Sequence, residues 1–315
     1  MQHNAPQARP SNAASPAAGR SFFSGTPGRP IYVDRITAAR NAPTRQPVVM
    51  VHGGCHTGTC YLATPDGREG WAGLFAAAGH NVFVVDWPGH GRSPTCDDLS
   101  LLPTREIAEA LQVLLERVGP AILLVHSASG PMAWWVAEQA PSTVVAIIGV
   151  APGAPANILR VLPEDPAEVA KLSHDVSLGC PVCLPEDRPM RVGRAFIRDF
   201  WANAPRFPKQ SLDAYALGIV PESARLFNER FNIGGRGLRI DDSASLAHHP
   251  ILIVTGDHDP RHPRAMDEAT ARYLGAEFVW LPDRGIAGNG HMPMIEDNNE
   301  VVAALLLEWL RSKKL

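Results

Sequence analysis

Six short apolar segments limit the folds that this chain can adopt. They are rich in valine and isoleucine, too short for most helices, and lack the alternation of a strand with one face in water. Their ranges are 47–53, 81–87, 121–127, 144–153, 250–257 and 276–282. Helical patterns at 103–119, 130–141 and 300–315 lie between or after them. Strands that alternate with helices predict an α/β fold with a mostly parallel sheet.

The alternation stops between two of these strands, at 154–245. This stretch is rich in proline, arginine and aromatic residues, and it holds helix-like pieces such as RAFIRDFWANA and ESARLFNERF. We expect it to form an inserted helical cap that shapes a substrate pocket. The predicted organisation is a disordered tail at 1–20, core at 21–153, cap at 154–245, and core again at 246–315.

Charge and hydropathy exclude some classes of partner. The 29 basic and 32 acidic residues give a formal net charge of −3, which offers no attraction to nucleic acid or to an anionic membrane. No apolar stretch approaches the roughly 20 residues of a membrane span. We therefore expect a small-molecule substrate, with no nucleic-acid or membrane partner. The sequence is compatible with a homodimer.

The five cysteines are too few for a disulfide framework in 315 residues, which favours a reducing compartment and a cytoplasmic location. The opening residues lack the apolar segment of a signal peptide, although an export signal removed upstream would also fit. Cys180 and Cys183 have C-x-x-C spacing inside the cap. We interpret them as ordinary thiols or a local disulfide rather than a redox centre.

Ser127 follows the apolar run AILLVH directly and precedes a helical pattern that begins with Gly130 and Pro131. A serine on a sharp turn from strand to helix is typical of a nucleophile elbow, whose usual form is G-x-S-x-G. Here Val125 and Ser129 replace the usual flanking glycines. Ser129 is the alternative nucleophile, and a plain helix N-cap is the structural alternative.

A second glycine-rich segment follows the strand at 47–53. The sequence His52-Gly53-Gly54 is typical of a loop that contributes a backbone N–H to an oxyanion hole. The second donor in such sites is the residue after the nucleophile. We therefore predict Gly54 and Ala128 as the two donors, with a simple tight turn as the alternative.

The acid and the base follow later in the chain. Asp257 and Asp259 lie at the end of the strand at 250–257, and we favour Asp259 as the acid that orients a histidine. His291 lies in a glycine-rich loop before the last helical pattern and is the predicted base. The order Ser127, Asp259, His291 is that of hydrolases with an α/β core.

The remaining histidines do not predict a metal site. His248 and His249, near the sequence DHDPRH, do not have a zinc-ligand spacing. We therefore expect no metal and no other cofactor.

With these motifs and DWPGHGRSP at 86–94, the chain resembles enzymes of the α/β-hydrolase fold. It is also similar to a small subfamily of bacterial carboxylesterases whose oxyanion loop carries two adjacent, disulfide-linked cysteines. The segments that carry this likeness are VHGGCHTGTCYLATPDGREGW, LLVHSASG and GNGHMPMIEDNN. The resemblance supports Ser127 as the nucleophile and Gly54 as a donor.

The chain departs from that subfamily at two positions. Gly54-Cys55 replaces the cysteine pair, and Ala151 stands where the subfamily has its glutamate acid. The resemblance therefore implies a serine hydrolase of carboxylic esters that takes its acid elsewhere, with Asp259 in the position that is common in the wider fold. Alternatives are cleavage of an amide, lactone or C–C bond with the same residues, or a non-catalytic binding protein.

Overall fold

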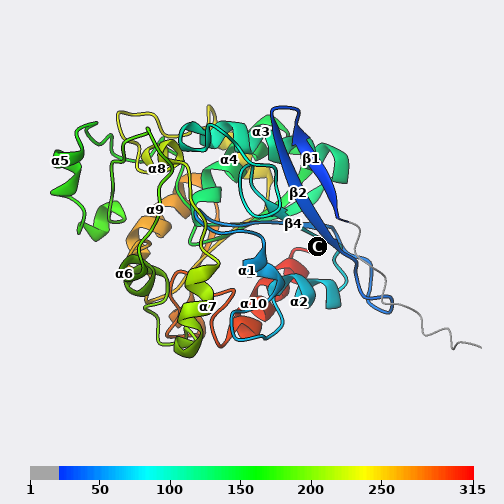
Figure 1. Ribbon diagram of the computed structural model, residues 1–315. Coiled ribbons are helices and arrows are strands. Elements are labelled where there is room, and N and C mark those ends of the chain that lie inside the picture. Colours follow the sequence, from blue (N-terminus) through cyan, green and yellow to red (C-terminus); the bar gives the residue numbers. More distant parts are fainter. Residues whose placement is uncertain (1–20) are drawn as a thin grey trace, which may run out of the picture.

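A computed structural model describes residues 21–315, and the predicted tail at 1–20 lies outside the described residues. An eight-stranded sheet with the order β1-β2-β4-β3-β5-β6-β7-β8 runs through the centre of the molecule (Figure 1). The strands from β4 through β8 in this order pair in parallel, whereas β1 and β2 are antiparallel. This is the α/β-hydrolase architecture that the sequence predicts.

All six predicted strands are present, each slightly shorter than its apolar run. They are β3 (Val48–Val51), β4 (Val82–Asp86), β5 (Ala121–His126), β6 (Val144–Val150), β7 (Ile251–Thr255) and β8 (Glu277–Trp280). Every residue of β3, β4, β5 and β7 is buried, which explains why these segments are apolar without alternation.

The hairpin of β1 (Phe22–Thr26) and β2 (Arg29–Ile36) was not predicted from the sequence. Its residues are mostly half-buried, and Gly25 and Pro30 interrupt the apolar pattern. The hairpin lies at the edge of the sheet, where strands tolerate proline and need less apolar surface. A search for continuous apolar runs therefore does not detect it.

Helices cover both faces of the sheet. The helices α3 (Thr104–Val118) and α4 (Gly130–Gln139) pack against each other on one face, and α2 (Trp71–Ala77) packs with α10 (Asn299–Ser312) on the other (Figure 1). The short α1 (Thr59–Leu62) follows β3, and α9 (Arg264–Leu274) connects β7 to β8. The three predicted core helices correspond to α3, α4 and α10.

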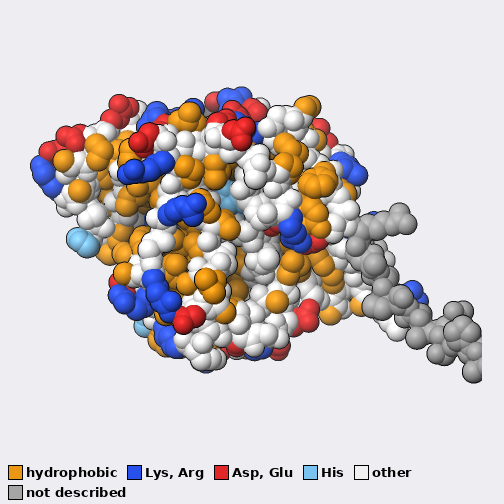
Figure 2. Space-filling view, viewed as in Figure 1, with side chains coloured by type: hydrophobic (Ala, Val, Ile, Leu, Met, Phe, Trp, Pro, Cys, Tyr) orange, Lys and Arg blue, Asp and Glu red, His pale blue; other side chains and the backbone are white. Residues whose placement is uncertain are grey.

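Residues 154–245, called the insert below, lie between β6 and β7 and contribute no strand to the sheet. Their α-helices have at most seven residues: α5 (Pro166–Ala170), α6 (Arg194–Phe196), α7 (Leu212–Leu217) and α8 (Ala224–Arg230). Figure 2 shows apolar side chains among lysines and arginines over this part of the surface. Such short helices depend on tertiary contacts for their stability.

The structure of the described residues addresses two predictions, one about the cysteines of the insert and one about membrane-spanning helices. Cys180 and Cys183 are both free thiols, so the local disulfide is not formed. Among residues 21–315, no helix has both the length and the apolar character that crossing a bilayer requires.

Candidate active site

The carboxyl end of β5 turns sharply at Ser127. Ser127 has a φ of +52°, in the left-handed region that a non-glycine residue enters at an energetic cost, and α4 begins three residues later. Its carbonyl accepts a 2.7 Å hydrogen bond from the N–H of Gly153, which helps to hold the turn. A strained serine between a strand and a helix has the geometry of a nucleophile elbow.

Ser129, the alternative nucleophile, is engaged within the turn itself. Its hydroxyl donates to the carbonyl of His126 at 2.8 Å and accepts from the N–H of His126 at 2.9 Å. The side chain is completely buried and does not contact His291. Ser129 therefore braces the turn that carries Ser127.

Ser127, His291 and Asp259 lie together at the carboxyl edge of the sheet. His291 Nε2 is 3.0 Å from Ser127 Oγ, and His291 Nδ1 is 2.6 Å from Asp259 Oδ2. All three residues are buried; Ser127, the most exposed of them, has an exposed fraction of 8%. The structure thus brings together three residues that are separated by up to 164 positions.

The electrostatics of this group favour a neutral imidazole beside an ionised carboxylate. Burial lowers the pKa of His291, although Asp259 partly opposes this. Burial alone would raise the pKa of Asp259, but the imidazole of His291 and the hydrogen bonds to Asp259 hold that pKa well below its usual range. A neutral His291 can accept a proton from Ser127 and then form a stabilised ion pair with Asp259.

Asp257 has a different position from Asp259. Its Oδ1 accepts hydrogen bonds from the N–H groups of Gly288 and Asn289, at 2.9 and 3.1 Å, in the loop that carries His291. Glu296 supports the same loop by accepting from the N–H of Gly290 at 2.8 Å. These two carboxylates fix the backbone of the histidine loop rather than the imidazole.

The loop after β3 lies directly against the Ser127 turn. A Cβ atom on Gly53 would be 2.6 Å from His126 Nδ1 and 3.0 Å from Ser127 Cβ, so only glycine fits there. The carbonyl of Gly53 is 2.8 Å from His52 Nδ1, and His52 Nε2 accepts from the N–H of Trp87. His52 therefore has its proton on Nδ1 and donates it to Gly53.

This contact orients the peptide between Gly53 and Gly54. Its carbonyl is held by His52, and within the described residues its other polar atom, the N–H of Gly54, makes no hydrogen bond. A buried N–H without a partner is uncommon and is available to a substrate atom. Ala128, the second predicted donor, lies in the short turn that follows Ser127.

The next peptide, between Gly54 and Cys55, is held at both of its polar atoms. The Gly54 carbonyl is 2.7 Å from His56 Nδ1, and the N–H of Cys55 donates to Glu222 Oε2 at 2.9 Å. His56 Nε2 is in turn 2.8 Å from the hydroxyl of Tyr215. Both Glu222 and Tyr215 belong to the insert, so the insert fixes the orientation of this loop.

Glu222 is fully buried and also contacts a histidine. His90 Nε2 lies 3.1 Å from Glu222 Oε2, and neither side chain is exposed. Burial would lower the pKa of His90, but Glu222 reverses this effect and raises it. Sequence analysis did not detect Glu222 or Tyr215, because their partners Cys55 and His56 are 167 and 159 residues away.

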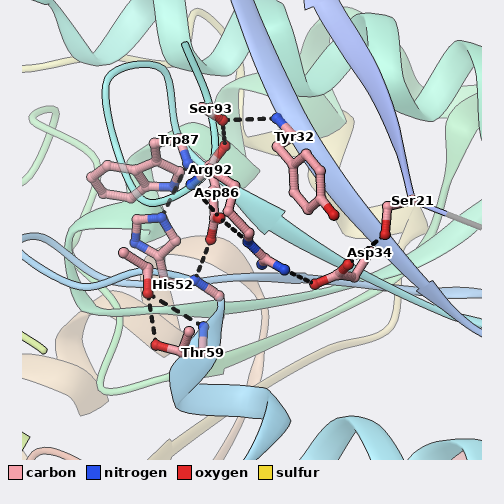
Figure 3. Close-up of polar contacts among 11 residues, drawn as sticks. Ser21, Tyr32, Asp34, His52, Thr59, Asp86, Trp87, Arg92 and Ser93 are labelled. Atoms are coloured by element: carbon pink, nitrogen blue, oxygen red, sulfur yellow. Dashed lines mark hydrogen bonds and ion pairs between the residues drawn. The ribbon is translucent and has the colours of Figure 1, made fainter. Parts of the chain in front are cut away.

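The motif DWPGHGRS supports the same loop from the other side (Figure 3). Asp86 Oδ1 accepts from the N–H of Gly58 at 2.7 Å, and Asp86 Oδ2 accepts from both the backbone N–H and Nε of Arg92. Ser93 Oγ donates to the Asp86 carbonyl at 2.6 Å and accepts from the N–H of Tyr32. The motif therefore ties the loop after β3 to β4 and β2.

Asp259, His262 and His291 have ligand atoms within 4.8 Å of one another, a cluster that could hold a metal ion. However, His262 Nδ1 already bonds to Asp267 at 3.1 Å, and its Nε2 accepts from Arg230 at 2.9 Å. Both ring nitrogens of His262 are thus used within the protein. This arrangement favours an orienting role for Asp259 over a role as metal ligand.

The fold and this geometry agree with a comparison to known families. The sequence model of the Alpha/beta hydrolase family matches residues 48–305. The chain belongs to this family. As in the predicted order, the alpha/beta hydrolase core carries Ser127, Asp259 and His291 in segments that come after β5, β7 and β8.

Two relatives of this alpha/beta hydrolase are named for hydrolytic activities. A probable secreted lipase of Fungal sp. (strain ATCC 74256) is 24% identical over 90% of this chain and 86% of its own length. A pyrethroid hydrolase of Sphingobium wenxiniae is 28% identical over 49% of this chain and 50% of its own length.

Solved structures support the fold at low sequence identity. An esterase of Rhodococcus sp. ECU1013 has a TM-score of 0.64 and 16% identity, and the match covers 94% of this chain and 99% of that one. An esterase of Thermogutta terrifontis has a TM-score of 0.61 and 22% identity, with coverages of 93% and 98%. These alpha/beta hydrolase structures share the architecture of the chain.

The resemblance to the subfamily with paired cysteines is not confirmed in its details. Cys55 and Cys60 are free thiols, and Cys55 has a left-handed φ of +63° beside Gly54. Ala151, at the position of the subfamily's glutamate, has a φ of +43° and donates its N–H to Val254. It has no carboxylate to offer His291, and Asp259 occupies that role geometrically.

Proposed function

We propose that this chain is a serine hydrolase of carboxylic esters, with Ser127 as nucleophile, His291 as general base and Asp259 as orienting acid. The observation that carries the proposal is the continuous contact from Ser127 Oγ through His291 to Asp259, at 3.0 and 2.6 Å, on a strained turn. The family and the hydrolytic names of the relatives support it.

In this mechanism, His291 takes the proton of Ser127 as the hydroxyl oxygen attacks the ester carbonyl. The resulting oxyanion is bound by the N–H groups of Gly54 and Ala128. His291 then protonates the leaving alcohol, and an acyl-enzyme remains on Ser127. A water molecule repeats these steps, with His291 as base, and releases the acid.

The insert acts as the cap of this site in our proposal. Tyr215 and Glu222 support the oxyanion loop from the insert through His56 and Cys55. Ser127 is only 8% exposed, so substrate entry requires movement of a neighbouring segment.

A fluorophosphonate probe tests the assignment directly. We expect one covalent adduct, located by mass spectrometry on Ser127, and no adduct in Ser127→Ala. The matched control is Ser129→Ala, which retains the adduct on Ser127. An adduct on Ser129 instead, or full esterase activity of Ser127→Ala, would contradict the proposal.

A further inference from the structure

Arg261 is a buried cation next to the proposed catalytic residues. It lies two positions after Asp259, and its backbone N–H donates to Asp259 Oδ1 at 3.0 Å. Only 4% of the residue is exposed. Its guanidinium also opposes the rise that burial and Glu222 impose on the pKa of the Cys55 thiol in the oxyanion loop. Arg261 is therefore close to both halves of the site.

The guanidinium of Arg261 has no anionic partner in the described part of the chain. No carboxylate oxygen lies within 4.0 Å of its nitrogens, and it donates no side-chain hydrogen bond to residues 21–315. The charge of Asp259 partly opposes the fall that burial imposes on the pKa of Arg261, but the oxygens of Asp259 contact His291 and the backbone N–H of Arg261 rather than its guanidinium. A buried, unpaired cation is costly, so arginines in such places normally have a partner.

Two aromatic rings hold the guanidinium in place. Its central carbon is 5.3 Å from the centroid of Phe196 and 5.4 Å from that of Phe231, and both rings belong to the insert. Cation–π contacts stabilise the charge without using the N–H donors. Six side-chain N and O atoms of the described residues are both inaccessible to solvent and without a hydrogen-bond partner, and none of them belongs to Arg261. Since the guanidinium nitrogens make no hydrogen bond, they must be accessible to a solvent-sized probe. The donors are thus held in position and open to a ligand.

Arg230 provides an internal comparison. It is a second arginine near Asp259, and it also lacks a carboxylate within 4.0 Å in the region described. However, its guanidinium donates to His262 Nε2 at 2.9 Å, and His262 passes this contact on to Asp267. The guanidinium of Arg230 therefore hydrogen-bonds within the protein, whereas that of Arg261 donates no hydrogen bond to residues 21–315.

A cavity of about 460 Å³ adjoins the ring that stacks on Arg261. Phe231 and His262 line it together with Arg230, whereas Arg261 itself is not part of its wall. Its other walls are mainly apolar side chains of the insert and α9, including Leu162, Leu178 and Met266. The ligand that fits this combination has an apolar body and one anionic group. A single free guanidinium fork matches the two oxygens of a carboxylate.

We propose that Arg261 binds a carboxylate of the substrate, so that the enzyme prefers esters that carry a free carboxylate in their acyl or alcohol part. Half-esters of dicarboxylic acids belong to this class. The inference rests on the proposed ester hydrolysis and names its substrate class. The insert supplies the rings that position Arg261, and the core supplies the arginine itself.

The test compares matched esters that differ only in charge. One pair is the p-nitrophenyl half-ester of adipic acid and its analogue with a primary amide in place of the carboxylate. The second pair is 4-carboxyphenyl butanoate and 4-carbamoylphenyl butanoate. For at least one pair, we expect wild-type kcat/KM to favour the carboxylate, and Arg261→Gln to lose about 10- to 100-fold on that ester alone.

Two controls separate specificity from loss of structure. Arg198→Gln removes an exposed arginine of the insert that is paired with Asp199, and it should leave both rates unchanged. Because Arg261 lowers the pKa of His291, the integrity of Ser127 and His291 is checked at a pH high enough to keep His291 neutral in both proteins, where Arg261→Gln should still react with a neutral fluorophosphonate. A similar loss on the charged and neutral esters, or no wild-type preference for the carboxylate in either pair, would overturn the inference.

A binding measurement keeps this inference separate from the proposed function. In Ser127→Ala, the half-ester of adipic acid should raise the melting temperature, and the added change Arg261→Gln should abolish that shift. If the shift occurs but wild-type protein shows no hydrolysis and no adduct, the hydrolase assignment fails while the carboxylate site stands. If hydrolysis occurs without the shift or the charge preference, the carboxylate site is wrong.

Discussion

The sheet core and the insert contribute to the site in different ways. The core carries Ser127, Asp259 and His291, which are all buried, in segments that come after β5, β7 and β8. The insert, with α-helices of at most seven residues, carries groups that act through others, such as Tyr215 on His56 and Glu222 on Cys55. We infer that the core determines the reaction, whereas the insert determines how well the oxyanion loop is oriented and which substrates fit.

The largest effect should come from the core nucleophile. Ser127→Ala removes the atom that attacks the ester, and we expect kcat to fall by about 10⁴- to 10⁶-fold. The melting temperature should change little, since Ser127 makes no hydrogen bond through its side chain other than that to His291 in the region described. Steady-state kinetics on p-nitrophenyl butanoate measure this, and a fall of less than tenfold would exclude Ser127 as nucleophile.

The acid should rank next. Asp259→Asn can no longer stabilise a protonated His291 or hold its tautomer, so we expect kcat to fall by about 10³- to 10⁴-fold. Asp257→Asn is the matched control, because Asp257 accepts hydrogen bonds from the backbone of the histidine loop at Gly288 and Asn289, and its Oδ2 lies 3.7 Å from Nε2 of the exposed His258. Equal losses in the two variants would show that the assignment of the acid is wrong.

A smaller effect is expected from the insert. Glu222→Gln weakens the hold on the Cys55 N–H and removes the partner of His90, and we expect kcat to fall by about 10- to 100-fold with little change in KM. Glu229→Gln is a control of the same type, since Glu229 is a buried carboxylate on α8 that accepts from the N–H of Thr104. If both variants lose kcat equally, the insert acts only through general stability.

Tyr215→Phe should have a modest effect. It removes the hydroxyl that contacts His56 Nε2 at 2.8 Å but keeps the aromatic ring. A single hydrogen bond of this kind corresponds to about a 2- to 10-fold change, which we expect in kcat. An effect as large as that of Asp259→Asn would place Tyr215 among the groups that act directly on the substrate.

The pH dependence of kcat/KM should reflect the ionisation of His291 in the core rather than of groups in the insert. Burial lowers the pKa of His291 from its ordinary value of 6.5. The imidazole therefore remains neutral, and able to accept a proton, at pH values somewhat below 6.5. Asp259 remains ionised over the same range because its pKa is lowered as well. As the pH falls, activity should therefore be retained to below pH 6.5 and lost only when His291 becomes protonated. A midpoint above 6.5 would contradict this environment for His291.

The sequence by itself determined the central sheet and the order of the residues that we propose as catalytic. Strands β3 to β7 can be predicted because they are almost entirely buried, so that each is a continuous apolar run, whereas β8 is only partly buried. The turn at Ser127 and the loop of Gly53 can be predicted from the sequence, because their tight backbone geometry restricts which amino acids fit at these positions. Asp259 and His291 follow from the rule that parallel strands bring their carboxyl ends to one edge of the sheet.

Only the tertiary structure decided which residues support the oxyanion loop and which one we propose to select the substrate. The β1–β2 hairpin has no continuous apolar run, and the short helices of the insert carry little periodicity of their own. Glu222 and Tyr215 contact residues more than 150 positions away, and the guanidinium of Arg261 has no carboxylate within 4.0 Å among residues 21–315. Short sequence patterns indicate backbone conformation and burial. Contacts between segments that are distant in the sequence form only when the chain folds, so these patterns do not predict them.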